Sequence, residues 1–168
     1  GQVAIVFLNR YGENPMGGGN WDCPAGIVPA VTDRDGAVHG TTIGSAFHVK
    51  SDRPVVAYDM FPYGGGQSLM TSATLLVPTS AWDVNYVAVN AFRETEWCGP
   101  WPTCRDQYPS ETSPFLQIVA AQDNTKVTIS PTAAIKGAIG IKPTGKGVPR
   151  TYVLERGEYL QITQSEEL

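Results

Sequence analysis

Short apolar runs, separated by turn-forming residues, recur along the whole chain. The clearest period-2 pattern covers residues 85–92, where Tyr86, Ala88 and Asn90 share one face and apolar residues share the other. No ten-residue stretch has helical periodicity, and residues 78–82 suit only a single helical turn. We predict strands over residues 2–8, 27–32, 43–50, 55–58, 71–77, 85–92, 115–121, 126–130, 151–154 and 159–162. The pattern predicts an all-β fold, an antiparallel β-sandwich with long decorated loops.

The connections between these strands are of two kinds. Residues 122–125 predict a tight turn, and Arg156 with Gly157 predicts the turn of a final hairpin. By contrast, residues 93–113 and 131–149 form long segments without a strand pattern, the first rich in Pro, Trp and Cys, the second in Gly, Pro and Lys. Loops this long in a compact domain are typically functional or structurally stapled.

Length and composition fit one domain of 168 residues. Charged residues make up 17% of the chain, below the typical value of about 25%. The net charge of −4 comes from scattered residues, and the Lys and Arg residues are too dispersed to predict a nucleic-acid partner. No apolar run reaches the roughly 18 residues that a membrane span requires. Because strand patterns lie at both ends, we expect residues 1–168 to be a single β-rich module and a fragment of a larger surface protein.

Cys98 and Cys104 flank five residues that include two prolines. That spacing allows the chain to bend back, so we predict a disulfide in an oxidising compartment, the alternative being two reduced thiols. Cys23 then has no partner within the loop; it pairs with another chain or segment, or stays free. Three cysteines with distant histidines lack the spacing of a zinc site, so no metal is expected.

The best candidates for binding are aromatic. Trp97, Trp101 and Tyr108 fall within one long loop, and Trp21 lies in another. Tryptophan and tyrosine give large, rigid contact areas and are enriched at binding hot spots. The alternative is that these rings fold inward and cap an open end of the sandwich.

Catalytic motifs are absent from the sequence: it has neither a nucleophile elbow nor a zinc-protease motif. His39 follows a predicted turn at residues 33–36, and His48 lies in a predicted strand, so both are expected to be structural or solvated. Glu94 and Glu96 beside Trp97 suit a sugar site or a solvated loop equally well. We therefore expect no enzyme activity, no catalytic residue and no cofactor.

Three stretches and the C-terminal segment together resemble bacterial relatives of the N-terminal domain of the IgG-Fc-binding protein family. The resemblance is carried, in order, by residues 51–58 (SDRPVVAY) with 62–66 (PYGGG), 71–82 (TSATLLVPTSAW) leading into 85–87, 118–131 (IVAAQDNTKVTISP), and 154–161 (LERGEYLQ). It implies a β-rich module of a secreted or cell-surface protein without catalytic residues. Antibody binding is not expected to carry over to a bacterial relative.

These observations predict a non-catalytic extracellular module for adhesion, matrix assembly or recognition of a protein or glycan. The alternative is a purely structural or self-assembling scaffold module of a larger surface protein. A carbohydrate-active enzyme is the third candidate. Glycan binding, self-association without ligand, and sugar release from a polysaccharide would distinguish the three in turn.

Overall fold

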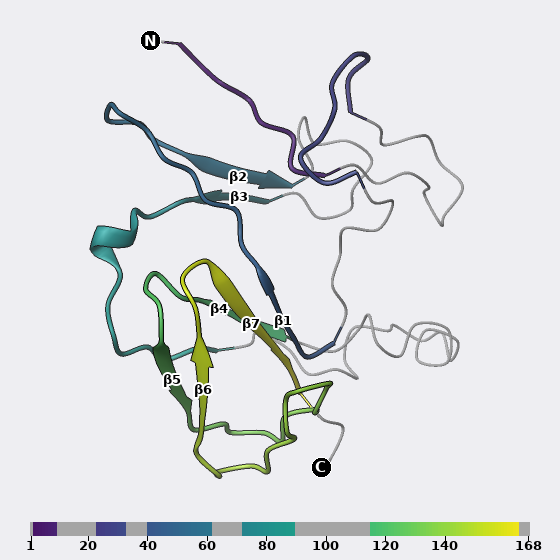
Figure 1. The fold of residues 1–168 in the computed structure, drawn as a ribbon, viewed down its shortest axis with the longest axis vertical. Coiled ribbons are helices and arrows are strands. Elements are labelled where there is room, and N and C mark those ends of the chain that lie inside the picture. The colour runs from purple at the N-terminus through teal and green to yellow at the C-terminus, as the bar shows by residue number, and fades with distance from the viewer. Residues whose placement is uncertain (1, 10–22, 33–39, 62–71, 90–114, 165–168) are drawn as a thin grey trace. The chain divides into compact units, whose positions relative to one another are not determined.

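The computed structural model describes residues 2–9, 23–32, 40–61, 72–89 and 115–164. Within them the fold is all-β with antiparallel sheets and a single short 3₁₀ turn, which confirms the predicted class (Figure 1). The chain divides into two compact units, Gly1–Val38 with Arg53–Pro78, and His39–Asp52 with Thr79–Leu168. The elements are β1 (Thr42–Ser45), β2 (Tyr58–Phe61), β3 (Ser72–Leu75), η1 (Thr79–Ala81), β4 (Phe115–Val119), β5 (Thr125–Ile129), β6 (Arg150–Leu154) and β7 (Glu158–Thr163).

The second unit contains two antiparallel sheets, one with the order β1-β7-β4 and one formed by β5 and β6 (Figure 1). β7 lies in the middle of the larger sheet: Leu160 pairs with Ile43 of β1 on one side and with Ile118 of β4 on the other. In the smaller sheet Val127 pairs with Tyr152. β5 and β6 are sequential and pair with each other, whereas β4 is followed by β5, and β6 by β7, in the opposite sheet.

The core of this unit lies between the two sheets. Leu154 of β6 and Leu160 of β7 are both fully buried. In β6 buried and more exposed residues alternate, so that every second side chain points to the opposite sheet, whereas Leu160 to Thr163 of β7 are all buried. The remaining buried apolar side chains of the cluster belong to Ala120, Ile135, Ile141, Tyr152 and Ile162, with Leu116, Val127 and Ile129 packed against them.

β7 is also buried on the face that points away from this core. Gln161 is 2% exposed, and its amide is satisfied on both sides: it accepts a hydrogen bond from Gln117 Nε2 (2.8 Å) and donates one to Gly40 O (2.7 Å). Thr163 lies on the same face, and its hydroxyl lies 2.9 Å from the hydroxyl of Thr41. Buried polar groups are costly unless they are hydrogen-bonded, so these pairs fix the register of β1 and β4 against β7.

The first unit contains the two-stranded sheet of β2 and β3, in which Tyr58 pairs with Leu75 and Met60 with Ala73. Side chains on this sheet are largely exposed: Tyr58 is 55%, Met60 51% and Leu75 53% accessible to solvent. A two-stranded sheet without a packed face is marginally stable by itself.

Three predicted strands are absent from the described part of the chain, and a fourth, predicted at 55–58, is displaced to β2 at 58–61. In the described residues, 2–8 and 27–32 form no ladder, although backbone bonds run from Ala30 N to Phe7 O and from Val31 N to Leu8 O. Residues 85–89 are not a strand either, and Val87 is 92% exposed. Apolar alternation indicates that a segment can form a strand, but a strand also needs a neighbour, which the pattern does not supply. The predicted turns at 78–82, at 122–125 and around Arg156 are confirmed.

Candidate functional site

The two short connections of the second unit, residues 120–124 between β4 and β5 and residues 155–157 between β6 and β7, form what we call the turn end. Both connections cross from one sheet to the other, so they lie side by side at one end of the sandwich (Figure 1). Backbone bonds join them directly, from Ala120 N to Glu158 O and from Gly157 N to Ala120 O, each 2.9 Å. The turn end is therefore one hydrogen-bonded corner.

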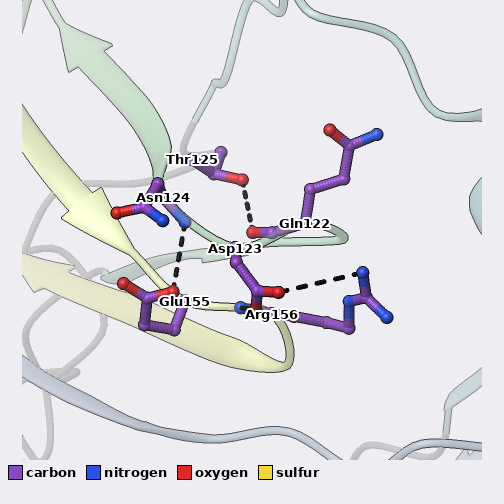
Figure 2. Close-up of polar contacts among 6 residues, drawn as sticks. All are labelled: Gln122, Asp123, Asn124, Thr125, Glu155 and Arg156. Carbon is purple, nitrogen blue, oxygen red and sulfur yellow. Dashed lines mark hydrogen bonds and ion pairs between the residues drawn. The ribbon is translucent and has the colours of Figure 1, made fainter.

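Two carboxylates at the turn end cap the opposite turn reciprocally, as Figure 2 shows. Glu155 Oε2 accepts the backbone N–H of Asn124 (3.1 Å), and Asp123 Oδ1 accepts the backbone N–H of Arg156 (3.1 Å). Asn124 has φ +57°, in the left-handed region that asparagine tolerates better than most residues. Thr125 Oγ1 closes the first turn by donating to Gln122 O (2.7 Å).

The charges at the turn end are largely used within it. Arg156 forms an ion pair with Asp123 (3.9 Å), but both side chains are more than 60% exposed, so the pair adds little stability. The carboxylate of Glu158 accepts the backbone N–H of Glu155 (2.8 Å). Since each of the three carboxylates already holds a backbone N–H, this arrangement supports a structural corner better than acid–base chemistry.

The long connection between β5 and β6, residues 130–149, lies at the opposite end of the sandwich, and we call it the loop end (Figure 1). Backbone hydrogen bonds fold it into a small hairpin: Ile135 and Thr144 bond reciprocally (2.8 and 3.2 Å), as do Ala138 and Ile141 (2.9 and 3.0 Å). Lys136 N donates to Thr163 O at the end of β7 (2.9 Å). The loop end is thus tied to the larger sheet.

Side chains of the loop end also reach the core. Ile135 and Ile141 are each 5% exposed and belong to the core cluster. Three polar atoms are buried and have no hydrogen-bond partner among the described residues: Thr144 Oγ1, Arg150 Nε and the hydroxyl of Tyr152. The sequence predicted residues 131–149 as a long loop; the structure shows a loop with its own hydrogen bonds and core anchors.

The aromatic candidates Trp97, Trp101, Tyr108 and Trp21, and the cysteines Cys98 and Cys104, all lie outside the described residues, as do His39, Glu94 and Glu96. Cys23 is half-buried and free, with its Sγ 4.0 Å from Asn9 O. His48 follows the end of β1 rather than lying within a strand, and its side chain is exposed.

Across the described ranges, no group of three or more metal-binding side chains comes together. In the same part of the chain, no helix has the length and apolar character needed to cross a membrane.

A comparison with protein families decides the relationship. The model of a family described as IgGFc binding protein matches residues 72–168, which is more than half of the chain. The chain belongs to the IgGFc binding protein family. The matched residues include β3 to β7 and both ends of the sandwich. No curated protein and no solved structure matches the chain.

The match confirms the resemblance for most of the stretches that carry it. Residues 118–131 and 154–161 lie within the IgGFc binding match and form the turn end with its flanking strands. Residues 51–66 lie outside the match. β1 also precedes it, yet β1 supplies an edge strand of the larger sheet. The larger sheet of the matched region, residues 72–168, therefore includes one strand, β1, that precedes this region in the sequence.

Sequence reasoning missed the reciprocal caps of the turn end. Both turns were predicted, but their contact was not, because the last two strands were expected to form a hairpin. That hairpin is wrong: β6 pairs with β5, and β7 pairs with β1 and β4. The sequence did contain a signal. Asp123 directly precedes Asn124, and Glu155 lies two residues before Gly157; both Asn124 and Gly157 have positive φ. Carboxylates at such turns commonly cap backbone N–H groups.

Proposed function

We propose that this chain is a non-catalytic extracellular recognition module that binds a protein or a glycan in adhesion or matrix assembly. The single observation that carries this proposal is membership of the IgGFc binding protein family across residues 72–168. The family description names binding rather than catalysis. From the same resemblance we propose a secreted or cell-surface location and a bacterial source. In a bacterial protein we expect the ligand to be something other than an antibody.

Most of the residues proposed to bind lie in the segment before β4 that the sequence predicts to be a long loop. Trp97, Trp101 and Tyr108 fall within residues 93–113, inside the family match, and Trp21 is proposed to add to them. Large rigid rings bury much area for little loss of side-chain entropy, which makes them effective anchors. A disulfide between Cys98 and Cys104 would preorganise the segment around Trp101 and reduce the entropic cost of binding.

A binding screen with matched tryptophan variants tests the proposal. We expect the wild-type chain to bind at least one member of a glycan array or a panel of extracellular matrix proteins. Trp97→Ala and Trp101→Ala should each weaken that binding at least about tenfold, as expected for a hot-spot ring. The control is Trp82→Ala, since Trp82 is a 40% exposed tryptophan that follows η1 and lies outside the proposed site.

Several results would refute this assignment. Equal loss in Trp82→Ala and the loop variants would mean that the rings support folding rather than binding. Sugar release from a polysaccharide would establish the enzymatic alternative. Recovery of Cys98 and Cys104 as free thiols, from protein never exposed to reductant, would refute the proposed disulfide.

A second candidate function is a self-assembling scaffold module, and the β2–β3 sheet favours it. Among the described residues no third strand pairs with either β2 or β3, and Tyr58, Met60 and Leu75 are all about half exposed. Exposed strand edges and apolar surface recruit partners. Sedimentation across a dilution series tests this candidate: concentration-dependent association without ligand supports it, and a monomer at every concentration refutes it.

A further inference from the structure

The charge of the loop end differs from that of the rest of the chain. Residues 124–154 contain five basic residues and no acidic one, although the chain as a whole has a net charge of −4. All sixteen acidic residues and the other seven basic residues lie outside this stretch. The basic residues are few in total, but the fold gathers four of them, Lys136, Lys142, Lys146 and Arg150, at the loop end or at the first residue of β6.

Two of these residues are available to a partner. Lys142 and Lys146 are exposed, and within the residues that the structure describes neither has an ion pair. Lys142 follows the buried Ile141, and Lys146 lies in a turn closed by the bond from Val148 N to Gly145 O (3.2 Å). Their backbone positions are therefore fixed although their side chains are free to contact solvent.

Preorganisation is what makes these lysines more than scattered surface charges. The hairpin bonds at Ile135 and Ala138, the bond from Lys136 N to β7, and the bond from Gly147 N to Pro131 O (2.8 Å) hold both ends of the connection. The cost of ordering a loop on binding is therefore reduced in advance.

We propose that the loop end binds an anionic polysaccharide, whose sulfate or carboxylate groups contact Lys142 and Lys146. This inference rests on the proposed function in taking the chain as a recognition module, but it assigns a second site, separate from the tryptophan loop. Lysine is a compact point charge on a flexible stem and does not demand the planar geometry that arginine does. A chain of repeated anionic groups suits such a surface.

Other partners fit the loop end less well. Residues 131–150 contain no aromatic residue, so unpaired bases and neutral sugar rings have nothing on which to stack. A second copy of the chain offers Asp123 and Glu155 at its turn end, but both already accept backbone N–H groups. Ile139 is fully exposed at the hairpin tip, yet a single exposed apolar residue is ordinary on a protein surface and does not require an apolar partner.

The test uses the whole chain, with heparin as the sulfated probe and polygalacturonate as the carboxylated probe. We expect wild-type protein to bind at least one of them at 50 mM salt, and to lose roughly tenfold in affinity at 200 mM, as two ionic contacts predict by analogy with nucleic acid. The double variant Lys142→Gln/Lys146→Gln should lose on the order of tenfold at 50 mM. The matched control Lys126→Gln/Arg156→Gln removes the same charge from exposed residues of β5 and the turn end, and should stay within about twofold.

Three outcomes would overturn the inference. Wild-type protein that binds neither glycan at 50 mM salt has no such site. Equal weakening in the control pair would mean that net charge, not the loop end, determines binding. Poly-glutamate bound as tightly as the glycans would identify an acidic protein as the partner. Trp97→Ala and Trp101→Ala should leave glycan binding at the loop end unchanged. A failure of the tryptophan assignment can therefore be distinguished from a failure of the lysine site at the loop end.

Discussion

The turn end and the loop end of the C-terminal sandwich are both connections between strands, but they are held by different interactions. At the turn end, Asp123 and Glu155 cap backbone N–H groups across two short turns. At the loop end, Ile135 and Ile141 insert into the core, and the backbone pairs with itself. One end is fixed by polar bonds at the surface and the other by buried apolar side chains.

This difference underlies our proposal that the turn end supports the fold and the loop end binds a partner. The carboxylates of the turn end are occupied by the backbone, so little charge there is free for a partner. At the loop end the anchors are apolar and buried, whereas Lys142 and Lys146 are exposed and have no ion pair among the described residues. A loop that is anchored through its apolar residues can present charged ones without loss of order.

The largest expected effect comes from removing an anchor of the loop end. Ile141→Ala should lower the free energy of unfolding by about 3 kcal/mol, since it removes buried methylenes and leaves a cavity. Denaturant unfolding followed by tryptophan fluorescence and circular dichroism measures it. Val153→Ala, at a 53% exposed position of β6, is the control and should cost much less. Equal costs would show that the loop end does not depend on its core anchor.

A smaller effect is expected at the turn end. Glu155→Ala removes the acceptor for Asn124 N–H and should cost about 1 kcal/mol, the size of a typical cap. Glu155→Gln keeps a side-chain oxygen in reach and should recover most of that loss. The same unfolding measurement applies. If Gln is as destabilising as Ala, the carboxylate does not act as a cap.

The smallest effect concerns the ion pair. Arg156→Ala should change stability by less than about 0.5 kcal/mol, because Arg156 and Asp123 are exposed and 3.9 Å apart. Asp123→Ala removes both that pair and the cap on Arg156 N–H, so it should cost more than Arg156→Ala. A larger loss in Arg156→Ala would mean that the guanidinium, rather than the cap, holds the corner.

The sequence predicted some parts of this structure well. The strands near 115–119, 125–129, 150–154 and 158–163 were predicted closely, since each is short, rich in apolar residues and bounded on one side by a short turn. Residues 2–8 and 85–89 were predicted as strands on the same kind of pattern and are not, because strand formation depends on a partner elsewhere in the chain.

The pattern of apolar and polar residues could not predict which polar side chains are buried or which distant strands pair. Gln161 has the sequence position of an outward-facing side chain, yet it is 2% exposed and bonded to Gln117 and Gly40. Nothing local distinguishes such a residue from a solvated one. The crossing of both turns between sheets was likewise hidden, because pairing between β4 and β7 joins segments about forty residues apart.

The central claim is that the loop end recognises and the turn end supports, and an amide-resolved NMR titration tests it most directly. Heparin oligosaccharide is added to the isotope-labelled chain at low salt, and chemical-shift changes are followed for each backbone amide. The titration is repeated with polygalacturonate oligosaccharide. For at least one of the two glycans the account predicts saturable changes at Lys142, Lys146 and their neighbours, with Asn124 and Glu155 unmoved. Changes centred on the turn end, or none at the loop end, would contradict it.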